Sequence, residues 1–185
     1  MFGAVERLII FDSYYSMHHP LDDVVPFCEW FLFPYLFWFV FMIGMLVYTA
    51  FWDVKSFKKY MWFIIITYTV TIIIYLLFPN QQELRVLDPG RSNVLVDFVQ
   101  WYYSFDTNTN VCPSLHVIGS IAVLYASWNS IHFKKWGIRI AMTAMTVLIS
   151  ISTVFLKQHS VLDIPPAVAL SLLAMPLASY LAKKL

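Results

Sequence analysis

Residues 31–51 read FLFPYLFWFVFMIGMLVYTAF, a segment with no charged side chain. Its length suffices to cross a bilayer, which takes about 20 mostly apolar residues. Four later runs have the same character, at 60–78, 115–131, 136–156 and 164–181. None alternates with a period of two, and lipid admits only helices or closed barrels. The sequence therefore predicts an all-α polytopic membrane bundle with five spans.

The overall composition agrees with a membrane location. Hydrophobic residues make up 60% of the chain and charged residues 12%, against about 45–50% and 25% in soluble domains. The net charge is +1, and no basic stripe indicates a nucleic-acid partner. With no repeat, low-complexity stretch or soluble module, we expect residues 1–185 to form a single integral membrane domain.

Three clusters of basic residues predict the topology. If the spans alternate, the clusters share one side of the membrane, which the positive-inside rule makes cytoplasmic. They are Lys55, Lys58 and Lys59; Lys134, Lys135 and Arg139; and Lys183 and Lys184. The 81–97 loop and the polar motifs then face the exterior, as expected for a plasma-membrane protein. Five spans also place the N-terminus outside although residues 1–26 contain no cleavable signal pattern, so we expect a further helix upstream.

The first polar motif is CPSLH at positions 112–116. Proline suits the first helical position, so the third span is expected to begin at Pro113. Free N–H groups at a helix N-terminus bind anions. Ser114 would add a hydroxyl donor and His116 a titratable group. The alternative, about equally favoured on this motif alone, is a capped helix with an interfacial histidine.

The second motif is STVFLKQHSVLD at positions 152–163. His159 and Asp163 are four positions apart, which places them on one face if the segment is helical. A carboxylate bound to one ring nitrogen orients the imidazole as a nucleophile or base, and Lys157 supplies a nearby cation. Alternatively, His159 and Asp163 only satisfy each other's hydrogen bonds at the end of a span. The Pro165-Pro166 pair also allows the helix to start only near Asp163.

Two further polar clusters lie on the same side. Arg85 follows the second span, and arginine is the preferred partner of phosphate oxygens, although a single loop arginine is usually just solvated. His18, His19, Asp22 and Asp23 suggest a metal or headgroup site, but a solvated interfacial loop is favoured. Together the motifs suit phosphoryl transfer, in which positioning and charge stabilisation dominate. A metal site, with two histidines and a carboxylate as ligands, ranks second. The positive charges expected nearby on Lys157 and Arg85 would disfavour a bound cation.

On these motifs the chain resembles the membrane-bound type 2 phosphatidic acid phosphatase superfamily, whose site is related to that of vanadium haloperoxidases. The family pattern is Lys-x6-Arg-Pro, Pro-Ser-x-His and Ser-Arg-x5-His-x3-Asp. The second part matches at Pro113, Ser114 and His116, and the third at Ser152, His159 and Asp163. Six helices are usual in the family, consistent with a missing first one.

The departures from the pattern are specific. Of the first part only Arg85 remains, because Phe78 stands at the lysine position and Val86 replaces proline. Thr153 stands at the position of the phosphate-binding arginine. Pro-Ser-Leu-His and Ser-Thr look like the branch that contains inositol phosphorylceramide synthases. Lys157 is expected to replace part of the lost charge, as a point charge rather than a fork.

The resemblance implies a role for each matched residue. His159 would form a phosphohistidine, Asp163 would orient it, and His116 would protonate the leaving group. Arg85, Ser114 and Lys157 would bind the phosphate oxygens. The implied partner is a lipid phosphate among the membrane lipids, with no metal or organic cofactor. Hydrolysis and transfer to an alcohol both stay open, and an inactive homologue, a transporter or a scaffold is the less favoured alternative.

Overall fold

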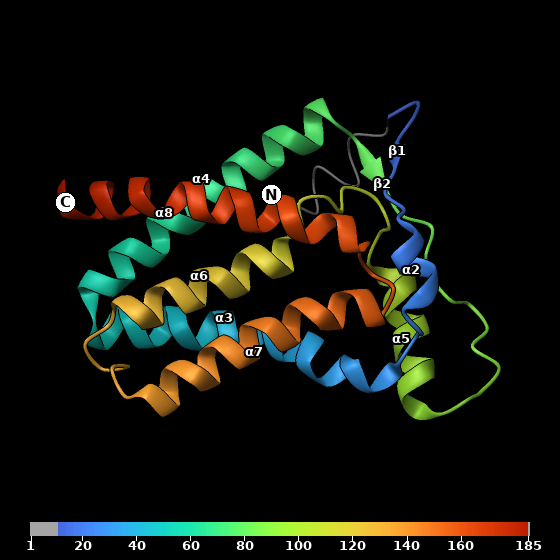
Figure 1. Cartoon of the computed structure of the whole chain (residues 1–185), viewed down its shortest axis with the longest axis horizontal. Helices are drawn as coiled ribbons and strands as arrows, with labels where there is room; N and C mark the ends of the chain where they lie inside the picture. The colour runs from blue at the N-terminus through green and yellow to red at the C-terminus, as the bar shows by residue number, and fades with distance from the viewer. Residues whose placement is uncertain (1–10, 185) are drawn as a thin grey trace.

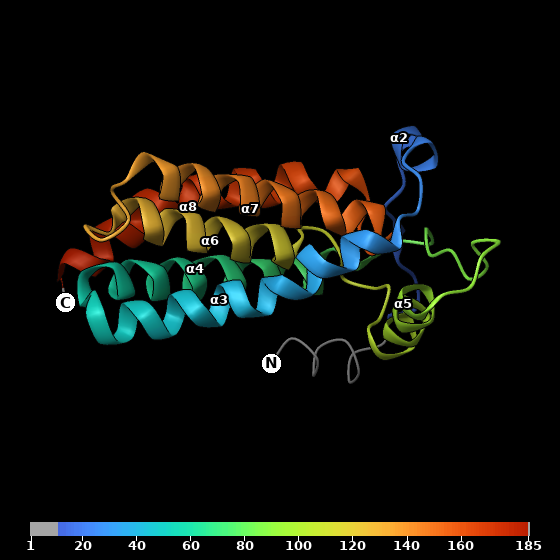
Figure 2. The same cartoon turned by 90° about the horizontal axis from the view of Figure 1, so that it is seen from below.

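Five helices run along one long axis in the structure, a computed structural model that describes residues 11–184 (Figure 1 and Figure 2). They are α3 (Leu32–Trp52), α4 (Val54–Leu77), α6 (Leu115–Asn129), α7 (Trp136–Phe155) and α8 (Ile164–Lys184). The short elements gather at one end of this bundle, opposite the C-terminus. These are β1 (Tyr15–Ser16), α2 (Pro20–Val24), the 3-10 turn η1 (Glu29–Phe31), β2 (Asn80–Gln81), α5 (Val94–Phe105) and the 3-10 turn η2 (Val161–Asp163). The expected helical bundle is confirmed, with a parallel β1–β2 pair in addition.

Four helices among the described residues are long and apolar enough to cross a membrane: Glu29–Trp52, Val54–Leu77, Trp136–Phe155 and Val161–Lys184. The third of the five predicted spans, at 115–131, is α6. This helix has 15 residues and a length of about 22 Å, short of the ~30 Å hydrocarbon core. The count of five spans is therefore not confirmed.

The short helix α6 lies at the centre of the bundle and packs against α3, α4, α7 and α8. Most of its side chains are buried, with Ile118, Ala122 and Val123 fully inaccessible, and only Trp128 and Asn129 at its end are exposed. Phe63 of α4 and Ile149 of α7 belong to the same apolar core. Because protein surrounds α6, the helix does not have to reach both membrane surfaces, and irregular backbone can precede it at depth.

Two predicted loops turn out to contain helix. Only Asp53 separates α3 from α4, and its carboxylate accepts hydrogen bonds from Ser56 N (3.1 Å) and Ser56 Oγ (2.8 Å). This cap starts α4 early, so the first lysine cluster lies in the opening turns of α4 and not in a loop. The 81–97 loop ends at α5, which Asn93 caps by accepting from Leu95 N and Val96 N, both at 3.0 Å.

The ends of the bundle divide the polar residues as the sequence predicts. Lys55, Lys58, Lys59 and Lys183 share one cavity at the end near the C-terminus. The 152–163 motif lies toward the opposite end, beside α2 and α5 (Figure 1), and the CPSLH motif is bound to it through Ser114 N and the backbone oxygen of Asp163. The expected upstream helix concerns positions outside the described residues.

Candidate active site

The centre of the site is a buried histidine–aspartate pair. His159 Nδ1 lies 2.9 Å from Asp163 Oδ2; Asp163 is inaccessible and His159 is 8% exposed. The intervening backbone is a turn and the 3-10 turn η2, not an α-helix. Ser160 N also donates to Asp163 Oδ2 (3.1 Å), which fixes the carboxylate. The pair forms although α8 begins only after Asp163, because this turn replaces the helical spacing.

His116 stands beside this pair, with its ring centroid 5.7 Å from that of His159. Tyr35 stacks on it at 4.4 Å and Trp38 lies at 4.5 Å. His116 Nε2 is buried and has no hydrogen-bond partner among residues 11–184. Two aromatic rings from α3 therefore fix the orientation of an imidazole that has an unused nitrogen.

The start of α6 differs from the prediction. Pro113 follows a cis peptide bond and precedes Ser114, which is the N-cap residue; Leu115 is the first helical residue. The expected helix start at Pro113 was wrong by two positions. Ser114 N donates to the backbone oxygen of Asp163 (3.2 Å), so the two motifs bind each other directly. Ser114 Oγ is inaccessible and unpaired within the described chain.

A cavity of about 310 Å³ opens onto the two histidines. Its lining combines apolar, mainly aromatic, residues with polar ones. The apolar part consists of Trp38, Phe39, Tyr68, Tyr75, Tyr102, Val111 and Leu115. The polar part consists of Asp106, Thr107, Thr109, Asn110, His116, Gln158 and His159. A mostly apolar lining with a few converging polar groups is typical of ligand sites of about this size.

Asn110 is a site residue that the sequence reasoning missed. It lines the cavity, is 2% exposed, and has neither amide atom paired within the part of the chain described. Its φ of 54° is in the left-handed region, which asparagine tolerates better than most residues. Asn110 N donates to the backbone oxygen of Asn80 at 2.6 Å. An asparagine just before the CPSLH motif was the available signal.

Asp106 places a carboxylate in the same lining. Burial raises the pKa of this carboxyl, against the opposing positive charge of Arg85. No recognisable motif surrounds Asp106 in the sequence, so this residue was also missed.

Arg85 lies behind the wall of the cavity. Its guanidinium donates to the backbone oxygens of Tyr103 (2.7 Å), Asp106 (3.0 Å) and Thr107 (2.8 Å), and to Gln158 Oε1 (3.0 Å). Three of these partners line the cavity. Arg85 therefore holds residues of the polar part of the lining in place, while its contribution to phosphate binding stays a prediction.

Lys157 points away from the cavity. Its ammonium donates to the backbone oxygens of Asp22 and Val25, both at 2.5 Å, and it is 6% exposed. Burial lowers the pKa of Lys157. The Thr153 hydroxyl donates to Ser150 O (2.8 Å). The position of Lys157 thus does not support its predicted binding of phosphate in place of the missing arginine.

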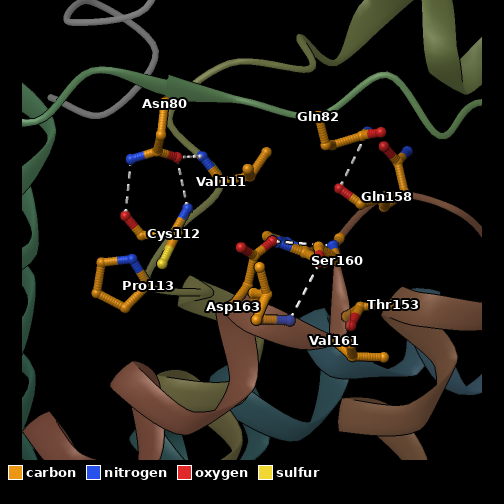
Figure 3. A network of polar contacts seen from close by, with 12 residues as sticks. Asn80, Gln82, Val111, Cys112, Pro113, Thr153, Gln158, Ser160, Val161 and Asp163 are labelled. Atoms are coloured by element: carbon orange, nitrogen blue, oxygen red, sulfur yellow. Dashed lines mark hydrogen bonds and ion pairs between the residues drawn. The ribbon is translucent and has the colours of Figure 1, made fainter. Parts of the chain in front are cut away.

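Two amide side chains from the segment after α4 hold the motif loops in place (Figure 3). Asn80 Oδ1 accepts from Val111 N (2.9 Å) and Cys112 N (2.8 Å), and Asn80 Nδ2 donates to Cys112 O (3.0 Å). Gln82 Nε2 donates to the backbone oxygens of Lys157 (3.1 Å) and Gln158 (3.3 Å). Both amides are inaccessible. One segment thereby fixes the spacing between the two histidine motifs.

Asp22 is buried, contrary to the expectation of a solvated loop at residues 18–23. It is 1% exposed; Oδ2 accepts from Ser160 Oγ (2.6 Å) and Oδ1 from Val161 N (2.8 Å). His18 and Asp23 are exposed and pair with each other at 2.9 Å. No group of three metal-ligating side chains is arranged to hold an ion in residues 11–184. Asp22 therefore anchors the second motif.

Gly119 permits the close approach that holds His116. A Cβ there would lie 2.9 Å from Trp38 Cζ2 and Nε1, and 3.0 Å from Met42 Sδ. The indole can contact both α6 and the His116 ring only because position 119 lacks a side chain.

Comparison with known proteins adds no relative: no family model, no curated protein and no solved structure matches this chain.

Proposed function

We propose that this protein is a membrane enzyme that hydrolyses a lipid phosphate monoester or diphosphate through a phosphohistidine intermediate. The observation that carries the proposal is the buried His159–Asp163 pair at 2.9 Å, open to a cavity that His116 also lines. A histidine held by a carboxylate is the arrangement that nucleophilic catalysis requires. The resemblance of the two motifs to lipid phosphatases supports the same reading.

The chemistry follows from which ring atoms are occupied. Because Asp163 binds His159 Nδ1, His159 Nε2 is left to attack phosphorus while the ester P–O bond breaks. His116 Nε2 donates a proton to the departing alkoxide. His116 then accepts a proton from water, whose oxygen attacks the phosphorus while the P–N bond to His159 Nε2 breaks, and phosphate is released. Asp163 stabilises the positive charge on His159 throughout.

The shape of the cavity supports a lipid substrate. The aromatic part of its lining includes Trp38 and Phe39 of α3 and Tyr68 and Tyr75 of α4, and both helices are candidate membrane spans. A chain entering from the bilayer would pass between α3 and α4 and bring its phosphate to the histidines. By the positive-inside rule we assign this end to the exterior of the plasma membrane, since the lysine clusters lie at the other end.

The test is release of inorganic phosphate from a panel of lipid phosphates by the purified protein in detergent, with EDTA present. We expect turnover that His159→Ala abolishes and His132→Ala retains; His132 is an exposed histidine at the basic end. Equal activity of the His159→Ala variant would overturn the nucleophile assignment. No turnover by the unsubstituted protein on any acceptor would point to an inactive homologue or a scaffold.

A second candidate is transfer of the phosphoryl group to an alcohol, as in inositol phosphorylceramide synthases. The observation that favours it is the cavity lining, which in the described chain includes the Asp106 carboxylate but no lysine or arginine. Such a lining suits a singly charged phosphodiester better than a dianionic monoester. Product analysis decides: free phosphate indicates hydrolysis, and a new headgroup lipid indicates transfer.

A further inference from the structure

A second cavity lies at the opposite end of the bundle, far from both histidine motifs. Its volume is about 470 Å³, and its lining includes Lys55, Lys58 and Lys59 of α4 and Lys183 of α8. Asn129, at the end of α6, completes the polar part. Two helices that are separate in sequence, α4 and α8, thus bring four ammonium groups around one space, and α6 adds a neutral amide.

These positive charges are not neutralised by the protein. No acidic side chain lines the cavity, and none of the four lysines forms an ion pair within residues 11–184. The nearest acid in sequence, Asp53, is already bound by Ser56 and by Ser130 Oγ (2.6 Å). Lys59 Nζ donates to the neutral Asn129 Oδ1 at 2.5 Å. An anion in the cavity would relieve the mutual repulsion of these groups.

The placement of the lysines on α4 increases that repulsion. Lys55, Lys58 and Lys59 lie in the opening turns of a 24-residue helix whose first turn holds no acidic residue. A helix N-terminus carries partial positive charge and favours anions over cations. Lys55 and Lys59 are also four positions apart, so two like charges share one helix face.

Exposed aromatic side chains indicate the depth of this cavity in the membrane. Trp52, Trp128 and Tyr180 are 64%, 46% and 54% exposed and lie near the ends of α3, α6 and α8 at this end of the bundle. Tryptophan and tyrosine at span ends sit at the lipid headgroups. The cavity therefore opens where phosphate groups of the bilayer are concentrated.

We propose that this basic cavity binds the phosphate headgroup of an anionic membrane lipid. Basic pockets between membrane helices are suited to such headgroups. Each ammonium supplies a point charge on a flexible stem. The site is separate from the proposed catalytic function and does not depend on it.

The test uses the full chain in detergent with added phosphatidylglycerol or phosphatidylcholine, and counts bound lipid by native mass spectrometry. We expect retention of phosphatidylglycerol and not of phosphatidylcholine. Lys58→Gln combined with Lys183→Gln removes two lining charges. The matched control is Lys134→Gln with Lys135→Gln, which removes two charges at the same end outside the lining. A charge near the lipid surface is worth about fivefold in binding, so the lining variant should lose about 25-fold and the control little.

Equal losses of phosphatidylglycerol binding in the two double variants would indicate only a general attraction between basic residues and anionic lipid, and would overturn the proposal. No loss of binding in either variant would also overturn it. Displacement of the lipid by millimolar inorganic phosphate would assign the cavity to free phosphate and also overturn it. Lys55→Gln, at an exposed position, repeats the test with one charge if the double variant fails to fold. Retained binding in that single variant, with phosphatidylcholine still excluded, would count against the site.

Discussion

Asp22 and Ser160 are joined by a hydrogen bond of 2.6 Å from the serine hydroxyl to the carboxylate, across 138 positions of sequence. The same carboxylate accepts from Val161 N, so the segment before the first span holds the turn between His159 and Asp163. The N-terminal segment is therefore part of the support of the site.

Asp22→Ala should impair the proposed catalysis without altering His159, the proposed nucleophile. It leaves the Val161 N–H and the Ser160 hydroxyl without their acceptor, at a cost of about 1–3 kcal/mol per buried group. A displacement of His159 by about 1 Å is enough for a loss of about 100-fold. Turnover and unfolding in detergent measure both effects. The adjacent exposed residue provides the control, Asp23→Ala, which should behave as the unsubstituted protein; similar losses in both would refute the anchor.

Lys157→Met should lower stability and leave the apparent substrate constant unchanged. The substitution keeps an apolar stem but removes the donor to the Asp22 and Val25 carbonyls. The thermal midpoint and the KM, measured on the same preparation, separate the two roles. A raised KM with an unchanged midpoint would restore the phosphate-binding role expected from the sequence.

Gly119→Ala should displace Trp38 and loosen the packing around His116. The added methyl would lie 2.9 Å from the indole, and such overpacking costs about 1–3 kcal/mol. Tryptophan fluorescence and turnover should both change. Gly44→Ala is the matched control, since a Cβ at Gly44 meets nothing within 4 Å and alanine is the better helix former. If Gly119→Ala kept full activity, the aromatic support of His116 would be dispensable.

Asn110→Gly isolates the amide side chain from the backbone. Glycine accepts the left-handed conformation at this position without strain, whereas Asn110→Ala adds strain to the loss of the amide. We expect Asn110→Gly to fold normally and to raise KM or lower kcat about tenfold, the scale of one hydrogen bond to substrate. Asn110→Ala should show the same kinetic defect with lower stability. Normal kinetics in the glycine variant would limit Asn110 to a backbone role.

Asp106→Asn should stabilise the protein at neutral pH. Because burial raises the pKa of Asp106 in the folded state, its neutral form is favoured there, and stability is lost as pH rises through that raised value. Asparagine removes this loss, so its advantage should be present at pH 7 and absent below about pH 3.9. Unfolding midpoints at the two pH values test the sign. The exposed-residue variant Asp97→Asn controls for the loss of one charge.

The helical bundle could be predicted from the apolar runs, and the His159–Asp163 pair from the spacing of the second motif. Four runs form membrane-length helices because continuous hydrophobicity needs no tertiary context. His159 and Asp163 meet because four positions bring them together in either a helix or this turn. The roles of Asp22, Asn80 and Gln82 were not predictable, since each binds residues remote in sequence. The helix α5 was overlooked although Asn93 offered a cap just before it.

The 15-residue α6 has a consequence for biogenesis. The four long helices can each enter a bilayer independently, since each is long and apolar enough to cross it. The central helix is too short for this and finds burial only after its neighbours have assembled. Because α6 carries His116 and begins at Leu115, just after its N-cap Ser114, we expect the geometry of the proposed catalytic site to form in a second, post-insertion stage. A chain halted after the first stage would be membrane-inserted, of normal length, and inert.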